Sequence, residues 1–373
     1  MRNDRGWQRL CWPVGRLLLC ACLVLPCGAA AGQSTQPGTA PASQPATMAA
    51  LSDADRALCA ELGLDPEQVA SLQAKPLYAF NEAEVDVYLR FLHASTPDLR
   101  DRVGHLARKN LGQPYELYLL GEAPFEVYDP QPIYCLDRSD CVVFAEHTYA
   151  MALSWDWPTF IAVLQRIRYA EGQIGVVTRN HYTEADWNPS NQWLVQDLSP
   201  RLPRRFTDTY RLKVDRARFF AQRYGLNTAH EVEELEVSYV PIERVMDMAG
   251  RLEEGDFVNF VYGQASVAGG DPACWVGHVG LIVIEDGKPH LLHSTPPKVK
   301  IEPLEGYVAG VLASMDARDA AGKRRTFGLK FHRLADDPWA NLRAIDGPSA
   351  PRVVAPGPFA APGFAPESAQ ARR

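Results

Sequence analysis

The chain has 373 residues, of which 46% are hydrophobic and 22% charged, and its formal net charge is −7. A globular chain of this size has enough apolar residues for one large domain or two modest ones. The acidic balance, with no run of lysines and arginines to follow a phosphate backbone, argues against nucleic acid as a partner.

The first 31 residues have the order of a secretory signal peptide. Four arginines precede the apolar run LLLCACLVLPC, and the small residues GAAAG follow it. That run is too short for a permanent membrane-spanning helix. We therefore expect a cleaved signal over 1–31 and a secreted or periplasmic protein. The letters LCAC, ending at Cys22, loosely resemble a lipoprotein signal, so membrane anchoring through a lipidated N-terminus is an alternative.

Both ends of the remaining chain have the composition of disordered segments. Residues 32–50 are rich in Pro, Ala, Ser, Thr and Gln and predict a flexible linker, and residues 346–373 predict a disordered Pro/Ala-rich tail. The folded part is therefore expected over 51–345, as a single domain with a helical N-terminal part.

The predicted helices come first along the folded part. They cover 51–63 with Ser52 as the N-cap, 96–112 with a glycine at its end, a stretch that begins at Cys141, and 156–172. Strand-like runs cluster later, over 255–263, 276–294 and 325–334. Helices before strands favour an α+β fold with an antiparallel sheet over a doubly wound one.

Cys141 stands at the start of its helix, in the stretch DRSDCVV. Ser139 or Asp140 is suited to cap that helix, and the free N–H groups and dipole of a helix start favour a negative charge. We therefore expect a lowered pKa for the Cys141 thiol and a reactive cysteine. The alternative is a buried structural cysteine.

The letters EDGK predict a tight β-hairpin with Asp286 and Gly287 in the loop. This register places His278 and His293 on one face of the sheet as diagonal neighbours, with His290 on the other face. Two histidines beside a cysteine suit a thiol hydrolase, in which one ring is the base and the other orients it. The alternatives are structural histidines or a metal pair, but no HExxH or paired CxxC accompanies them, so we expect no metal.

Three ordered stretches resemble the NlpC superfamily of papain-like cell-wall cysteine hydrolases: LGQPYELYLLGE, RSDCVVFAEHTYAMAL and GHVGLIVIEDGKPHLLHSTPPKVKIEPL. The intervening WDWPTFIAVLQRIRYAEGQIGVVTRNHYTEADW is similar to one branch, the N-acetylmuramoyl-L-alanine amidase-like family. The resemblance implies a papain-like α+β fold with the nucleophile at a helix N-terminus packed on an antiparallel sheet. It covers about 111–304.

Carried over to this sequence, the resemblance makes Cys141 the nucleophile, His278 the general base and His293 the third member of a triad. Tyr115 matches a tyrosine beside the nucleophile, where it would help to hold an oxyanion. The alternative is a core or surface tyrosine in a turn, without a role in catalysis. The stretch RNHYTEADW is expected to contact substrate, and its candidate substrate-binding residues are Arg179, His181, Tyr182, Asp186 and Trp187. The alternative is a structural loop held in place by its aromatic side chains.

The resemblance implies an enzyme without cofactor or metal that cleaves an amide bond of peptidoglycan or muropeptides through a thioester, N-acetylmuramoyl-L-alanine being favoured. A γ-D-glutamyl-diamino acid bond, acyl transfer by the same triad, and a non-catalytic cell-wall-binding protein are the alternatives. We further expect a bridge between Cys135 and Cys274, a rim or lid over 263–274, and His147 on the wet face of its helix.

Overall fold

The structure, a computed structural model, describes residues 51–264 and 273–346. The predicted signal peptide, linker and tail lie outside the described residues, and so does most of the loop predicted to form a rim or lid. Within the described ranges, no helix is both long enough and apolar enough to cross a bilayer.

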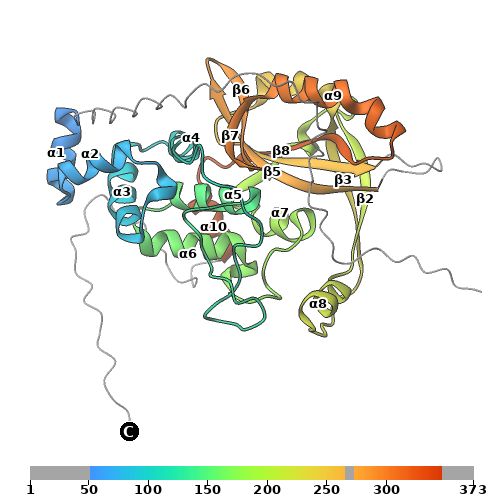
Figure 1. Ribbon diagram of the computed structural model, residues 1–373, viewed down its shortest axis with the longest axis horizontal. Helices are drawn as coiled ribbons and strands as arrows, with labels where there is room; N and C mark the ends of the chain where they lie inside the picture. Colours follow the sequence, from blue (N-terminus) through green and yellow to red (C-terminus); the bar gives the residue numbers. More distant parts are fainter. Residues whose placement is uncertain (1–50, 265–272, 347–373) are drawn as a thin grey trace, which may run out of the picture. The chain divides into compact units, whose positions relative to one another are not determined.

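Short capped helices make up the N-terminal part (Figure 1). Ser52 caps the first helix by accepting a hydrogen bond from the backbone N–H of Asp55, and Gly63 ends it in the left-handed conformation, as predicted. The helix predicted over 96–112 is shorter, because Asp98 caps it and it ends at Asn110 rather than at a glycine. The bounds of these elements are α1 Asp53–Leu62, α2 Pro66–Ala74, α3 Glu82–Ser95 and α4 Leu99–Lys109.

Six further α-helices follow in the described residues, three before the first strand and three among or after the strands. They are α5 Cys141–Ala152, α6 Trp157–Arg168, α7 Asn188–Ser190, α8 Arg216–Tyr224, α9 Leu304–Ala320 and α10 Pro338–Asp346, and the 3₁₀ segment η6 covers Ile242–Arg251. The helix predicted over 156–172 thus ends four residues early, at Arg168. Ten of the twelve residues of α5 are buried, so this helix runs through the protein interior.

The strands form one antiparallel sheet in the order β2-β3-β8-β4-β5-β6-β7, and β1 pairs with β8 off this path. The strands are β1 Val195–Asp197, β2 Asp208–Val214, β3 Glu233–Pro241, β4 Phe257–Gln264, β5 Ala273–Glu285, β6 Lys288–Thr295, β7 Lys298–Pro303 and β8 Arg325–Leu334. The predicted α+β fold with an antiparallel sheet is confirmed. The strands β1, β2, β3 and β7 are additions to the predicted strands.

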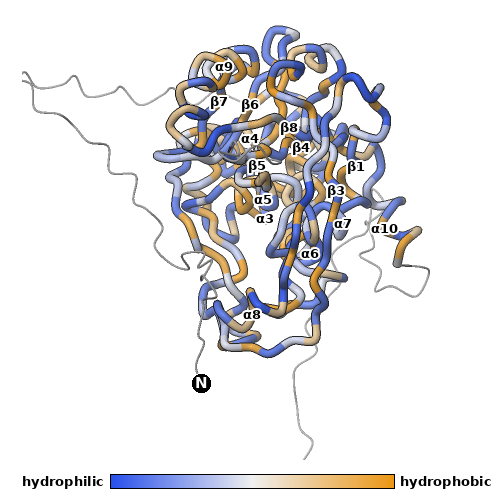
Figure 2. Tube along the Cα trace, turned by 90° about the vertical axis from the view of Figure 1, so that its right-hand side faces the viewer, coloured by the Kyte–Doolittle hydropathy of each residue, from blue (hydrophilic) through white to orange (hydrophobic). Residues whose placement is uncertain are grey.

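The sheet has a hydrophobic core on each face. Leu281 and Leu292 belong to the core shared with α5 and α6, where Figure 2 shows hydrophobic residues gathered. Ile282 and Leu291, their neighbours along the strands, belong to the core shared with α9 and η6. Adjacent strand residues point to opposite faces, so the sheet lies between α5 on one side and α9 on the other.

The hairpin β5–β6 has the predicted register. Glu285 pairs with Lys288, and the loop residues Asp286 and Gly287 have φ of 50° and 74°, as a two-residue loop with positive φ at both positions requires. The ladder runs back to the pair of Leu281 and Leu292 and stops there. At the next position His293 lies against Gly280, where an added Cβ would come 3.0 Å from the His293 Cβ.

Candidate active site

Asp140 fixes the start of the helix that carries Cys141. Its side chain accepts hydrogen bonds from the backbone N–H groups of Val142 and Val143, at 3.0 and 2.8 Å, which makes it the N-cap of α5. These bonds use helix-start donors that otherwise have no partner within the helix. Of the two predicted caps, Asp140 is therefore the one the structure uses, and Cys141 is the first residue of the helix.

Ser139 attaches the residues before this helix to β6 and to the loop at Gln113. Its hydroxyl donates to the Gln113 side-chain oxygen at 2.7 Å and lies 3.0 Å from the Ser294 hydroxyl, which donates to the Ser139 carbonyl at 2.9 Å. Only 1% of Ser139 is exposed. Buried hydrogen bonds of this kind hold their partners in one geometry, so the helix start is fixed relative to the sheet.

Tyr115 lies beside the helix start because its backbone pairs with Ser139 in an isolated parallel bridge. Burial, followed by the nearby Cys141 thiolate and Asp140 charges, raises the pKa of the Tyr115 hydroxyl. That hydroxyl therefore stays protonated at neutral pH and is available as a hydrogen-bond donor next to Cys141.

Cys141 faces β5 next to one of the candidate histidines. The backbone N–H of Val279, the residue after His278, points at its sulfur and favours the thiolate. Burial and the Asp140 carboxylate outweigh this hydrogen bond, and they raise the pKa of the Cys141 thiol to about 12. The expected lowering of this pKa is thus wrong: the cap that presents the cysteine also places a carboxylate beside it.

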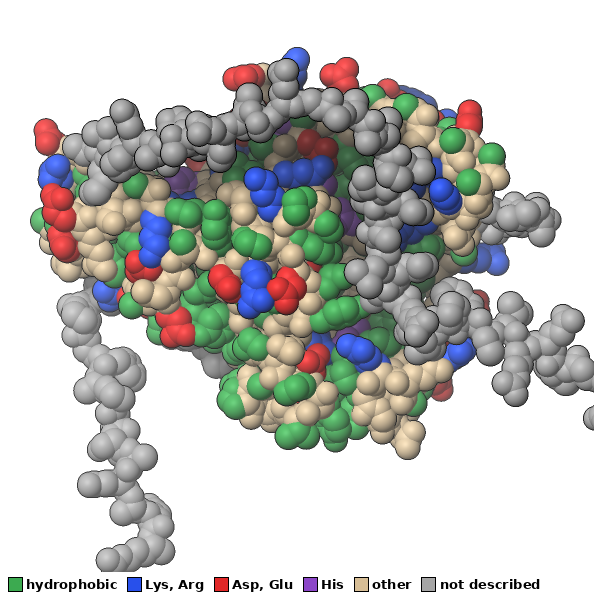
Figure 3. Space-filling model, in the orientation of Figure 1, with side chains coloured by type: hydrophobic (Ala, Val, Ile, Leu, Met, Phe, Trp, Pro, Cys, Tyr) green, Lys and Arg blue, Asp and Glu red, His purple; other side chains and the backbone are tan. Residues whose placement is uncertain are grey.

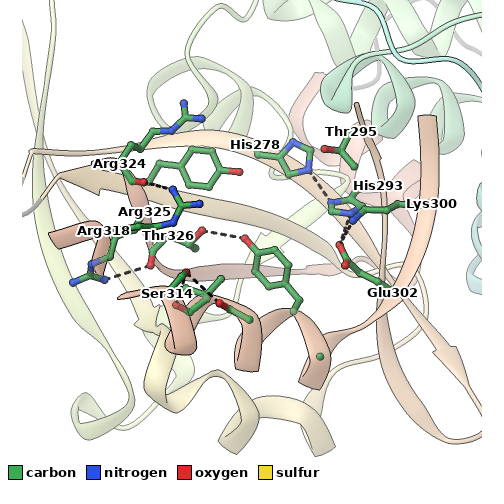
Figure 4. Close-up of a pocket in the computed structure, with 15 residues that line it drawn as sticks. His278, His293, Thr295, Lys300, Glu302, Ser314, Arg318, Arg324, Arg325 and Thr326 are labelled. Carbon is green, nitrogen blue, oxygen red and sulfur yellow. Dashed lines mark hydrogen bonds and ion pairs between the residues drawn. The ribbon is translucent and has the colours of Figure 1, made fainter. Parts of the chain in front are cut away.

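His278 and His293 form one hydrogen-bonded unit, as their shared sheet face predicts. Nε2 of His278 lies 2.8 Å from Nδ1 of His293. Nε2 of His293 lies 2.9 Å from a carboxylate oxygen of Glu302 on β7, and the Lys300 ammonium contacts that same oxygen at 2.9 Å. The result is a chain of side chains that runs from β5 through β6 to β7 (Figure 4).

The Glu302 carboxylate determines where the protons of this chain lie. The His293 hydrogen bond, which outweighs desolvation, together with the bond from Lys300 lowers the pKa of Glu302 to about 2, so the carboxylate is ionised and only accepts. Nε2 of His293 must then carry a proton, and neutral His293 accepts at Nδ1. His278 consequently donates from Nε2, and its Nδ1 is left with a lone pair.

His278 is neutral at physiological pH. Burial is the main cause that lowers its pKa to about 3, and the charge of Lys300 adds to it. A neutral ring with a free lone pair accepts a proton. At neutral pH Cys141 is therefore a protonated thiol and His278 a neutral imidazole.

A cavity of about 460 Å³ opens onto the two histidines (Figure 4). Tyr262 of β4, Lys300, Glu302 and residues of α9 and β8 also line it. The Cys141 thiolate charge contributes to the raised pKa of Tyr262, which is about 12 with burial as its main cause. Tyr262 thus lies within electrostatic range of the thiol and against the cavity, on the α9 side of the sheet.

Glu302 and Lys300 are functional candidates that the sequence analysis missed. His293 faces Lys300 across β6 and β7, and Glu302 is the diagonal neighbour two residues further on. The alternation in KVKIEP carries this signal, since it places both charged residues on one strand face. The turn TPPK that joins the strands has no single predicted register, so the sequence alone did not align the two strands.

Two of the predicted substrate-binding residues are held in internal contacts away from the histidine cavity. Arg179, whose side chain is 9% exposed, forms ion pairs with Glu122 at 3.3 Å and Asp129 at 3.0 Å. His181 Nε2 contacts the carbonyl of Val176 at 2.6 Å, and burial lowers its pKa to about 3. These bonds tie the stretch to the loops before Cys141.

The other three have internal partners of their own. Tyr182 packs its ring against the ring of Phe219, and its backbone N–H donates to Asp186. The Asp186 carboxylate also accepts from Arg216. Trp187 is 2% exposed and donates to Glu146 at 3.0 Å. None of the five residues is among those that line the cavity at the histidines, and their contact with substrate stays a prediction.

Two other expectations need correction. Cys135 and Cys274 are free thiols: Cys135 packs near Leu119 and Leu120, and Cys274 lies in a separate cluster with Tyr210. The predicted bridge is therefore not formed.

His147 is buried, not on a wet helix face, because α5 is surrounded by other elements. Its Nε2 accepts from the backbone N–H of Cys135 at 3.3 Å. Burial lowers the pKa of His147 to about 3.

The comparisons with known proteins agree with this fold. A family model described as N-acetylmuramoyl-L-alanine amidase-like matches residues 105–311, more than half of the chain. A solved Legionella pneumophila protein is 17% identical and superimposes with a TM-score of 0.55 over 68% of this chain and 97% of its own. An N-acetylmuramoyl-L-alanine amidase of Bacteroides uniformis is 22% identical, with a TM-score of 0.48 over 64% of this chain and 99% of its own. No curated protein matches the chain.

The Legionella structure is below 25% identity and speaks only for the fold. The family match covers the helix of Cys141, the strands of His278 and His293, and Glu302. The chain belongs to the N-acetylmuramoyl-L-alanine amidase-like family.

Proposed function

We propose that the protein is a cysteine amidohydrolase that cleaves the bond between N-acetylmuramic acid and L-alanine in peptidoglycan fragments. The family membership supports the substrate class. The observations that carry the mechanism are the hydrogen-bonded chain of His278, His293 and Glu302 and a cysteine at a helix start, whose sulfur is met by the backbone N–H of Val279, the residue after His278. The proposed arrangement is papain-like, with a nucleophile helix packed on an antiparallel sheet that supplies the base.

In the first half of the reaction, the Cys141 thiol gives its proton to Nδ1 of His278, and its sulfur attacks the carbonyl carbon of the muramoyl lactyl group. The C–S bond forms as the carbonyl π electrons move to oxygen. The oxyanion then re-forms the carbonyl, the C–N bond breaks, and His278 gives its proton to the departing amino group of L-alanine. The peptide leaves, and the muramoyl group stays on Cys141 as a thioester.

In the second half, water gives a proton to Nδ1 of His278 and its oxygen attacks the thioester carbonyl. Collapse of this second tetrahedral intermediate breaks the C–S bond, and the sulfur regains its proton from His278. The products are the muramic acid carboxylate and the free peptide, with no net change in the enzyme.

His293 and Glu302 act as positioning residues in this scheme. When Nδ1 of His278 takes a proton, its ring becomes a cation that still donates from Nε2 to His293, and the Glu302 carboxylate stabilises that charge through His293. The same contacts exclude the other tautomer of His278, in which Nδ1 carries the proton and no longer serves as a base.

The Tyr115 hydroxyl and backbone N–H groups at the start of α5 are the proposed donors to the oxyanion. The position of Tyr115 beside the helix start and its raised pKa support this role. Donors that are already oriented before the reaction stabilise developing charge without reorganising.

Product analysis of a defined muropeptide tests the function. The substrate is N-acetylmuramoyl-L-alanyl-γ-D-glutamyl-diaminopimelate, and the readout is mass spectrometry of its products. We expect free N-acetylmuramic acid and the intact tripeptide, with no release after Cys141→Ala. The matched control is Cys135→Ala, which removes another partly buried thiol and should retain activity.

The other functions give different products. Free diaminopimelate would indicate the γ-D-glutamyl-diamino acid bond, and a muramoyl adduct with an added amine would indicate acyl transfer. Equal release by the wild-type protein and Cys141→Ala would refute the thiol mechanism. Binding of the muropeptide without any release would favour a non-catalytic cell-wall protein.

A role on peptidoglycan also agrees with the proposed export of the chain. We propose that residues 1–31 direct secretion or transport to the periplasm and are then removed. Cell fractionation followed by N-terminal sequencing of the mature protein tests this, and a mature chain that begins at Met1 in the cytoplasmic fraction would contradict it.

A further inference from the structure

The cavity beside the histidine pair carries more basic than acidic side chains. Lys300, Arg318, Arg324 and Arg325 line it, against the single carboxylate of Glu302. The arginines come from the end of α9 and the start of β8. Figure 4 shows them across the cavity from the histidines and Lys300.

Two of these basic groups are already neutralised. Lys300 contacts Glu302 at 2.9 Å, and Arg325 contacts Asp319 at 2.7 Å. Neither side chain needs a ligand to balance its charge.

Arg318 and Arg324 differ from them, since within residues 51–264 and 273–346 neither has a carboxylate within ion-pair distance. Arg318 donates to the carbonyl of Arg324 at 3.0 Å, which joins the end of α9 to the start of β8. The Arg324 guanidinium lies 4.8 Å from the centre of the Tyr262 ring. Both arginines thus line the cavity from its exposed edge, without a carboxylate partner among the described residues.

The field of these arginines reaches the reaction centre. The charges of Arg324 and Arg318 lower the pKa of Tyr262, whereas the Cys141 thiolate charge raises it. Tyr262 lines the cavity together with the two histidines and both arginines. A substrate whose scissile amide is at the proposed base, His278, would extend through this cavity toward the arginines.

The cluster is unusual for this chain. The protein carries 45 acidic and 38 basic residues, and on the face drawn in Figure 3 acidic and basic side chains are interspersed. The family match ends at residue 311, so Arg318 and Arg324 lie beyond it. Nothing in the family assignment accounts for a positive group at this position.

We infer that Arg318 and Arg324 form a carboxylate-binding subsite, which selects muropeptides that carry a free carboxylate on the peptide close to the scissile amide. This inference rests on the proposed function and names its substrate class. A planar guanidinium matches a carboxylate with two parallel hydrogen bonds. The cavity, at about 460 Å³, has the size of small-ligand pockets, and a γ-linked glutamate or a terminal diamino acid supplies free carboxylates within such a span.

The test compares substrates that differ by one carboxylate. The tripeptide muropeptide is prepared with all carboxyl groups free and with each carboxyl amidated in turn, and kcat/KM is measured for each. For at least one position, we expect the wild-type enzyme to prefer the free acid by about tenfold to a hundredfold, as hydrogen bonds to charged groups imply. In the double variant Arg318→Gln, Arg324→Gln that preference should fall to about onefold to threefold, mainly through a higher KM for the free acid.

Arg211→Gln is the matched control, because Arg211 is an exposed arginine of β2 outside the cavity. It should keep the wild-type preference. A wild-type enzyme that cleaves the free and amidated substrates equally well, or a double variant that keeps the full preference, would overturn the inference.

A binding measurement separates failure of the subsite from failure of the proposed function. Cys141→Ala protein is titrated calorimetrically with the same free and amidated muropeptides, with and without the arginine substitutions. If the wild-type enzyme cleaves none of them, the proposed function fails, and tighter binding of the free acid that depends on the arginines still supports the subsite. Equal affinities for free and amidated forms would refute the subsite whatever the activity.

Discussion

Nε2 of His278 lies 2.8 Å from Nδ1 of His293, and the second nitrogen of His293 lies 2.9 Å from the Glu302 carboxylate. Because a carboxylate only accepts hydrogen bonds, this geometry fixes the tautomer of both rings. The imidazole at β5 is thereby left with its lone pair at Nδ1. A glutamate on β7 thus determines whether a histidine two strands away is a base.

Glu302→Gln tests this tautomer argument. The amide replaces an obligatory acceptor with a group that also donates, so the rings are no longer held in one tautomer. We expect kcat to fall by about tenfold to a hundredfold with little change in KM, comparable to the loss of an orienting carboxylate elsewhere. Steady-state kinetics on the muropeptide substrate measure this, and Glu305→Gln, at the start of α9, is the control.

Glu302 should also affect acid stability. Its pKa is lowered to about 2 in the folded protein, against roughly 4.3 for an unperturbed glutamate. Ionised Glu302 therefore stabilises the folded protein. This stabilisation is complete above the pKa of Glu302 in the unfolded chain and is lost as the pH falls through its pKa in the folded protein. The difference in unfolding free energy between the wild type and Glu302→Gln should shrink between about pH 4.3 and pH 2. A pH-independent difference would contradict this.

The pH profile of catalysis follows from the lowered pKa of His278. The proposed base works only when neutral, and burial, with a smaller effect of the Lys300 charge, keeps it neutral down to about pH 3. Activity in the free enzyme should therefore show no loss as the pH falls through the ordinary histidine range near 6.5. The measurement is kcat/KM over the pH range in which the fold is intact, followed by circular dichroism. An acidic limb centred near 6.5 would contradict the assignment.

Alkylation of the free enzyme tests the protonation state of Cys141. With its pKa raised to about 12, the thiol should react slowly with iodoacetamide at neutral pH, and the rate should still rise above the ordinary thiol range near 8.5. Peptide mapping of Cys141 as a function of pH gives the rate at this residue alone. A plateau already reached below pH 7 would mean a preformed thiolate.

Two substitutions of Asp140 separate its effect on helix stability from its effect on the pKa of Cys141. Asp140→Ala removes the acceptor for the N–H groups of Val142 and Val143, and loss of an N-cap costs about 0.5–2 kcal/mol of stability. Asp140→Asn keeps an acceptor but removes the charge that raises the pKa of Cys141. The asparagine variant should therefore stay closer to wild-type stability in urea denaturation and show alkylation at lower pH. Identical alkylation profiles for the two proteins would refute the electrostatic argument.

Arg179 tests whether the RNHYTEADW stretch is structural or contacts substrate. Its guanidinium pairs with the fully buried Glu122 and with Asp129. Arg179→Gln leaves a buried carboxylate without its partner, which costs about 3–5 kcal/mol. We expect a lower urea midpoint as the main effect. An unchanged midpoint with a raised KM would instead support the substrate-binding prediction.

Much of this site followed from local sequence signals. The cap before Cys141 and the loop residues Asp286 and Gly287 are short-range patterns. The loop residues fix the hairpin register, and that register was enough to place the two histidines on one sheet face. The same reasoning failed for the thiol pKa. Helix position is a local property, but burial under the sheet is not, and burial is the larger effect.

The missed features all depend on contacts between distant segments. Glu302 reaches His293 only because β7 turns back on β6, and Arg318 reaches the cavity only because α9 crosses the sheet. His147 was expected on the wet face of its helix, whereas α6 covers it through Phe160. Sequence patterns predict which face of an element is apolar, but not which element lies against it.

The most direct test of the central claim is to trap the acyl-enzyme. Wild-type protein is mixed with the muropeptide, quenched in acid within the first turnover, and digested for mass spectrometry. The account predicts a muramoyl thioester on the peptide that contains Cys141, and none in Cys141→Ala. Rapid release of N-acetylmuramic acid without an adduct, at a rate that Cys141→Ala retains, would contradict it.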